Sequence, residues 1–85
     1  MFLIIILTSL TYQRDIKPIF INRCSSCHNE NWKDKNWLDY QTAFKYRIQI
    51  KQRVSVLKNM PPIGMKITDE ERKIIQKWVD QGAKE

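Results

Sequence analysis

A first helical pattern lies just before the two cysteines of the chain. Ile16, Ile19 and Phe20 recur at the spacing that places side chains on one face of an α-helix. Asp15 precedes them and suits the N-cap position, because its carboxylate can accept a hydrogen bond from a backbone N–H of the first turn. The pattern therefore predicts a helix that begins at Asp15 and leads to Cys24.

The middle of the chain is predicted to hold a loop and further helical segments. Residues 29–36 are mostly polar, which favours a loop. Asp39 can cap the next helix. The apolar positions that follow Asp39 at helical spacing are Tyr40, Ala43, Phe44 and Ile48, and a further apolar face comprises Ile50, Val54 and Leu57. The pattern leaves open whether these two faces belong to one helix or to two. Two prolines after Met60 end the helical pattern, because a residue before proline is pushed out of the helical region.

The last helix carries the clearest end signals. Thr68 and Glu71 have the spacing of a capping box, and Gly82 is a natural stop. The apolar stripe of this helix is formed by Ile74, Ile75, Trp78 and Val79. That stripe needs a partner, and the apolar face of the first helix is the other clean one near a chain end. With no alternating β pattern, the sequence predicts an all-α fold of three to four helices whose terminal helices pack together.

The chain length limits what this fold can be. Eighty-five residues make at most one domain and exclude a large enzyme with its own substrate domain. Residues 1–11 carry no charged side chain, and we expect a short export signal or hydrophobic N-terminal segment there, followed by a folded domain over residues 12–85. A buried first strand or helix turn is the alternative. The apolar run is about half of the roughly 20 residues that a membrane-spanning helix needs. Domains this short usually require a disulfide, a metal or another stabilising group.

The positive charge is concentrated in the middle third of the chain. The formal net charge is +6, and residues 40–68 contain six cations and no acid, whereas the flanks hold nine of each. Such a stretch can attract an acidic protein, an anionic lipid surface or nucleic acid. No nucleic-acid-binding motif accompanies it, so we expect no nucleic acid partner.

Candidate chemistry is concentrated in the five residues from Cys24 to His28. Cys24 and Cys27 are the only cysteines and His28 is the only histidine. If the preceding helix continues through them, all three side chains lie on one face within about one turn. Two cysteines three residues apart followed directly by histidine is the spacing of covalent c-type haem attachment. A structural zinc site normally needs four ligands, and a thioredoxin-like redox pair needs a βαβ context; both, like a plain disulfide, fit less well.

Over residues 15–83 the chain resembles small mono-haem class I c-type cytochromes, most closely compact bacterial haem domains with a Met-Pro-Pro distal loop. The matching pieces are Ile16-Lys17-Pro18-Ile19-Phe20, Cys24-Ser25-Ser26-Cys27-His28, Met60-Pro61-Pro62-Ile63-Gly64, Ile67-Thr68-Asp69-Glu70-Glu71-Arg72, Trp78-Val79 and Gly82-Ala83. The resemblance implies a compact class I cytochrome c fold around one haem c. Cys24 and Cys27 would bind it covalently, and His28 and Met60 would ligate the iron. Met65 competes with Met60, which is preferred because two prolines stiffen its loop.

Two features of the family pattern are not matched by recognisable residues. Many members have a Gly-Pro-Leu stretch after the haem motif, whose backbone carbonyl accepts a hydrogen bond from the histidine ring, and residues 29–38 offer no equivalent. The residues that would bind the haem propionates are also open. The candidates are Trp32, Trp37, Tyr40, Tyr46 and Arg53.

The expected function is one-electron transfer rather than enzymatic catalysis, because an iron ligated on both faces has no open position for substrate. If Met60 is displaced, the alternative is a haem-based peroxidase or gas-binding sensor. The chain could also be the haem subunit or domain of a larger respiratory oxidoreductase, and a non-haem interaction module with structural cysteines is a further alternative.

We expect export to the periplasm or the outer face of the cytoplasmic membrane, with the N-terminal segment as a route to membrane association. A redox partner with an acidic docking surface is expected to bind the basic stretch, where Lys58 and Lys66 flank Met60.

Overall fold

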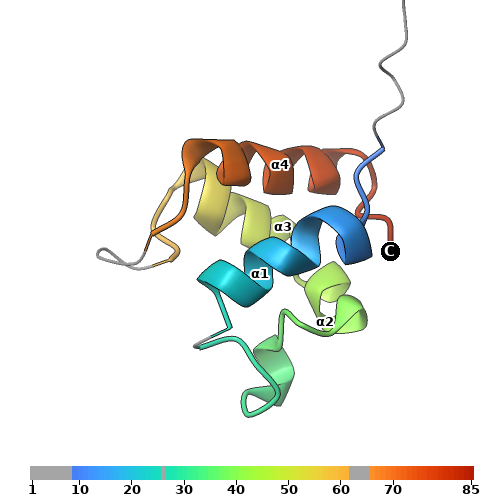
Figure 1. The fold of residues 1–85 in the computed structure, drawn as a ribbon, viewed down its shortest axis with the longest axis vertical. Coiled ribbons are helices and arrows are strands. Elements are labelled where there is room, and N and C mark those ends of the chain that lie inside the picture. Colours follow the sequence, from blue (N-terminus) through green and yellow to red (C-terminus); the bar gives the residue numbers. More distant parts are fainter. Residues whose placement is uncertain (1–8, 26, 62–65) are drawn as a thin grey trace, which may run out of the picture.

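All regular secondary structure in the described part of the protein is helical. The computed structural model describes residues 9–25, 27–61 and 66–85. The elements are a π-helical turn η2 (Tyr12–Ile16), α1 (Lys17–Arg23), a 3-10 turn η3 (Lys33–Lys35), α2 (Tyr40–Lys45), α3 (Arg47–Lys51), a π-helical turn η4 (Gln52–Val56) and α4 (Asp69–Asp80). The described ranges contain no strand. The prediction of an all-α fold is therefore confirmed (Figure 1).

Most of the predicted N-terminal apolar run lies outside the described residues, and so does the competing Met65. Leu10, at the end of that run, belongs to the described part of the chain. Its side chain packs against the core, and its backbone N–H donates to Gln81 Oε1 at 2.9 Å. Within the described ranges, none of the helices combines the length and apolar character needed to cross a membrane.

The first helical segment begins earlier than predicted. Its N-cap is Thr11, whose hydroxyl accepts a hydrogen bond from Arg14 N, while the Asp15 carboxylate accepts one from Thr11 N at 2.9 Å. The prediction that Asp15 starts the helix is therefore wrong. Asp15 instead lies in the first turn and returns a hydrogen bond to the cap, an arrangement like a capping box. The earlier start makes Tyr12 a helical residue that faces the core.

The first helical segment and α4 share the centre of the core. The largest fully buried side chains are Trp78, Tyr12, Phe20, Ile16 and Ile75. The Tyr12 ring centroid lies 6.1 Å from Trp78 and 6.2 Å from Phe20. The two chain ends are also joined by backbone hydrogen bonds, including one of 2.8 Å from Tyr12 N to Lys84 O. Figure 1 shows the blue start of the described chain beside its C-terminus. The predicted contact between the terminal helices is present.

The middle of the chain forms two helical segments. Asp39 caps α2 as predicted, with its carboxylate accepting from Thr42 N at 3.0 Å. The backbone then breaks at Tyr46 (φ −102°, ψ 16°), and a second segment runs through α3 and η4. The predicted apolar faces are only partly correct, because Ile48 is 63% exposed and Leu57 is 54% exposed. The break at Tyr46 and the wider π-helical turn change which side chains face the core.

The capping box of α4 is confirmed. Glu71 N donates to Thr68 Oγ1 at 3.0 Å, and Thr68 N donates to Glu71 Oε1 at 2.9 Å. Glu71 also binds Arg23 at the end of α1, with 3.0 Å between Arg23 Nε and Glu71 Oε1. At the other end of α4, Gly82 adopts a φ of +105°, in the region that favours glycine. These contacts fix α4 against the end of α1, where the cysteines begin.

We expect Tyr12→Phe to destabilise the fold by about 1–3 kcal/mol, because the buried hydroxyl donates to Trp37 O at 2.6 Å and that carbonyl would lose its partner. Burial, together with the charge of Asp39, raises the pKa of Tyr12, so the hydroxyl stays protonated. Urea unfolding measures the effect. Tyr40→Phe is the matched control: its hydroxyl donates to Ala83 O at 2.7 Å but is only half-buried, so a smaller loss is expected. Equal losses of unfolding free energy in the two variants would show that burial does not increase the contribution of the Tyr12 hydrogen bond.

Candidate functional site

The two cysteines and the histidine lie in a tight turn at the end of α1. The helix ends at Arg23, so the conditional expectation that it continues through these residues is not met. The turn is closed by the carbonyl oxygen of Cys24, which accepts from Cys27 N at 3.1 Å and from His28 N at 2.8 Å. Because the Cys24 carbonyl binds both Cys27 and His28, the three side chains stay within about one turn of each other. They are therefore close enough to contact one cofactor.

The two thiols differ in exposure. Cys24 is buried, and burial raises its pKa to about 11, with smaller contributions from Cys27 and Glu71. Cys27 is exposed at the outer edge of the turn. A reactive redox cysteine has a pKa below the ordinary value, because the thiolate is the nucleophile. The environment of Cys24 acts in the opposite direction and favours the protonated thiol at this position.

His28 is held by a backbone carbonyl that the sequence did not reveal. Its Nδ1 lies 2.9 Å from the carbonyl oxygen of Lys35 in η3. Burial lowers the pKa of His28, which favours the neutral ring, and a carbonyl can only accept, so Nδ1 carries the proton. The Nε2 lone pair is then available as a metal ligand. The carbonyl of Lys35 is therefore the acceptor for the His28 ring that the sequence did not indicate.

Two tryptophans fix the plane of the His28 ring. Trp32 stacks on one side with ring centroids 4.9 Å apart and an angle of 15°. Trp37 stacks with a centroid distance of 4.7 Å and an angle of 17°. Trp37 is buried, whereas Trp32 is 46% exposed. The imidazole is thus restrained by its neighbours as well as by the hydrogen bond to Lys35.

His28 faces a partly open cavity of about 290 Å³. The residues that line it are Phe20, Arg23, Cys24, Cys27, His28, Trp32, Lys35, Trp37, Gln49, Ile50, Arg53, Val54, Met60 and Pro61. Most of these side chains are apolar or aromatic, as in many small-molecule sites. All four predicted site residues, Cys24, Cys27, His28 and Met60, are brought together around this one cavity.

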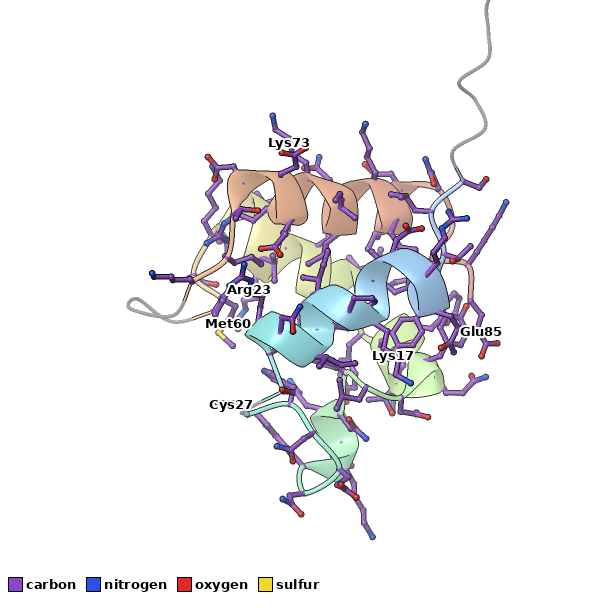
Figure 2. The ribbon with its side chains drawn as sticks, viewed as in Figure 1. Lys17, Arg23, Cys27, Met60, Lys73 and Glu85 are labelled. Carbon is purple, nitrogen blue, oxygen red and sulfur yellow. The ribbon has the colours of Figure 1, made fainter. Side chains whose placement is uncertain are left out.

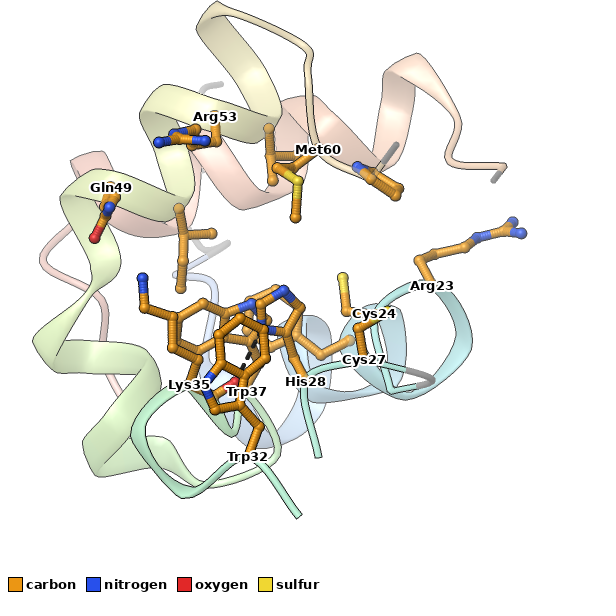
Figure 3. Close-up of a pocket in the computed structure, with 14 residues that line it drawn as sticks. Arg23, Cys24, Cys27, His28, Trp32, Lys35, Trp37, Gln49, Arg53 and Met60 are labelled. Atoms are coloured by element: carbon orange, nitrogen blue, oxygen red, sulfur yellow. Dashed lines mark hydrogen bonds between the residues drawn. The ribbon is translucent and has the colours of Figure 1, made fainter. Parts of the chain in front are cut away.

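Met60 and His28 lie on opposite sides of the cavity. Figure 3 shows the Met60 side chain directed from the segment after η4 toward the side occupied by His28, with both cysteines at one edge. Figure 2 places Arg23, Cys27 and Met60 on the same side of the molecule, away from Lys17 and Glu85. A nitrogen and a thioether sulfur therefore face the same space from two directions.

The edge of the cavity away from the cysteines is polar. Lys35, Gln49 and Arg53 lie there (Figure 3). Of the five residues considered for binding haem propionates, Trp32, Trp37 and Arg53 line the cavity. Tyr40 and Tyr46 do not, because Tyr40 binds Ala83 O and the Tyr46 ring contacts Lys35 and Lys45.

The donor set suits a cofactor that extends across the cavity better than a bare ion. In the described ranges, no group of three or more His, Cys, Asp and Glu side chains converges on a point where a metal ion could bind. An apolar cavity with two thiols at one edge, an imidazole on one side and a thioether on the other fits the faces and edges of a haem c. The residues present therefore fit that group.

Comparison with known proteins adds no assignment: no family model, no curated protein and no solved structure matches the chain.

Proposed function

We propose that this protein is a one-electron carrier with a covalently attached haem c. Cys24 and Cys27 would form the thioether bonds, and His28 and Met60 would ligate the iron. The observation that carries the proposal is the position of His28 and Met60 on opposite sides of one apolar cavity, with both thiols at its edge. These are the residues that the resemblance to class I c-type cytochromes assigns to the same roles.

The surroundings of His28 support its role as the proximal ligand. The hydrogen bond from Nδ1 to Lys35 O leaves Nε2 unprotonated, and the two stacked tryptophans limit rotation of the ring. A backbone acceptor on the second ring nitrogen is the usual way in which a ligating histidine is oriented. The chain therefore holds this ligand ready without a rearrangement of the turn.

Ligation from both sides supports electron transfer rather than catalysis. When bound, the haem would supply a reversible one-electron iron couple. His28 and Met60 would both ligate the iron and leave no free position for substrate, and Met/His ligation would raise the reduction potential. We therefore propose that the protein is not an enzyme.

The polar edge of the cavity suits the carboxylates of a haem. Lys35, Gln49 and Arg53 lie away from the cysteines, as the propionates of haem lie away from its thioether edge. Among the described residues Arg53 has no acidic side chain within ion-pair distance. A propionate there would supply the missing opposite charge.

We further propose that the protein is exported and meets its redox partner through the basic middle segment, residues 40–68. One of the six cations is neutralised within the fold, because Lys51 Nζ lies 2.5 Å from Asp80 Oδ1. Lys45, Lys58 and Lys66 are exposed and remain to attract an acidic docking surface. Residues 1–11 would direct export and could keep the domain at the membrane.

The test of the function is co-expression with a cytochrome c maturation system, followed by a haem-stained denaturing gel and an absorbance spectrum. We expect haem to stay with the chain on the gel, and the oxidised protein to show the Met-to-iron charge-transfer band. Covalent haem without that band would favour the peroxidase or sensor class. A folded helical protein that carries no haem would reject the proposal in favour of an interaction module.

A further inference from the structure

Arg72 in α4 binds the backbone that carries Met60. Its Nη1 donates to the carbonyl oxygen of Val54 and lies 3.3 Å from the carbonyl oxygen of Met60. Arg72 is partly buried and does not line the cavity that His28 faces. Its guanidinium therefore contacts the chain behind the thioether without reaching the place where a cofactor would lie.

The carbonyls that Arg72 binds need a donor from outside their own segment. The last carbonyls of a helix have no intrahelical N–H partner, and Val54 lies in η4, whose helical pattern ends two residues later. A cation near the C-terminal end of a helix is also favourable, because the backbone dipoles place partial negative charge there. Arg72 supplies both the hydrogen bond and the charge.

Further bonds restrain the same segment. Ser55 Oγ in η4 donates to Arg72 O in α4 at 2.7 Å, so each of the two elements donates a hydrogen bond to the other. Met60 N lies 3.3 Å from Arg53 O, and Asn59 N lies 3.0 Å from the same oxygen. The backbone of Met60 is thus bound at its N–H by η4 and at its carbonyl by α4. These two bonds set the position from which its side chain extends into the cavity.

We propose that Arg72 is a positioning residue that holds the Met60 thioether over the cavity. This inference rests on the proposed function, since a fixed thioether matters only if it ligates iron. Arg72 is not placed in contact with the cofactor. Its effect would be to keep Met60 in a ligating position and so to suppress competition by external ligands.

The test uses holoprotein and compares Arg72→Gln with Lys73→Gln, which removes the same charge from the next residue of α4. Lys73 is exposed and extends away from the rest of the molecule (Figure 2). In Arg72→Gln we expect covalent haem to be retained, because Cys24, Cys27 and His28 are untouched. The Met-to-iron charge-transfer band should weaken, and exogenous imidazole should bind about tenfold to a hundredfold more tightly, as the loss of hydrogen bonds from a charged donor implies. Lys73→Gln should behave as the unmodified protein does.

Arg72→Lys distinguishes positioning from a general loss of stability. Lysine keeps the charge but has a single donor group, so it should restore part of the band and part of the resistance to imidazole. This variant also keeps the test decisive if Arg72→Gln fails to fold. A protein with haem, an intact band and unchanged imidazole affinity in every folded Arg72 variant would overturn the inference. Absence of haem from the unmodified protein would instead reject the proposed function.

Discussion

Replacing both Cys24 and Cys27 by alanine is expected to abolish covalently bound haem and to lower the thermal stability of the protein strongly. The cavity beside these thiols is partly open, so without covalent bonds the cofactor would be held only by its ligands and by contacts with the cavity lining. The chain is also short, and a domain of this size has little stability to spare. A bound group stabilises the folded state, and a covalent tether prevents its loss by dilution.

The matched control for the double variant is Ser25→Ala, which changes the same turn without removing a thiol. The Ser25 hydroxyl donates to Ile21 O at 2.6 Å at an exposed site, so only a small loss of stability is expected. Haem-stained gels and thermal unfolding report the two effects separately. If neither protein carries haem and the double variant unfolds at the temperature of the unmodified protein, the cysteines bind no haem and do not stabilise the fold, and the haem assignment is wrong.

Met60→Ala is expected to give a high-spin or ligand-accessible iron with a lower reduction potential, while Met65→Ala keeps the unmodified spectrum. On the proposed ligation, external ligands would have to displace the Met60 thioether, so their apparent affinity would be the intrinsic affinity multiplied by the fraction of time for which that position is free. If Met60 is absent from the iron for about 1% of the time, its removal strengthens imidazole binding about 100-fold. Titration followed by absorbance measures this change.

The same titration decides between the two methionines. Met60 is partly buried and lines the cavity opposite His28, whereas Met65 lies outside the described residues. A variant at Met65 that loses the charge-transfer band, together with a Met60 variant that keeps it, would transfer the distal role to Met65. Retention of the band in both single variants would mean that either methionine can take the distal position when the other is absent.

Features set by short-range contacts were predictable from the sequence. The capping box of Thr68 and Glu71 and the cap at Asp39 involve residues three positions apart, so the sequence contains both partners of each interaction. The turn from Cys24 to His28 is equally local. Cys24, Cys27 and His28 could be named for this reason, whereas Met60 was named from the resemblance to class I c-type cytochromes.

Features that depend on tertiary contacts were not predictable. The sequence does not single out Thr11 as the helix start, because Asp15 is an equally good cap by residue type and only the burial of Tyr12 in the assembled core distinguishes them. The Lys35 carbonyl gives no side-chain signal, since any residue could supply it. Arg72 reaches a segment 12 residues earlier in the chain, and no sequence pattern links the two.

The most direct test of the central claim is the mass of the peptide that trypsin releases between Arg23 and Lys33. This peptide, residues 24–33, contains both cysteines and His28. From protein made with a cytochrome c maturation system, it should carry the added mass of one haem, bound through Cys24 and Cys27. The unmodified peptide, recovered in full from such protein, would contradict the account.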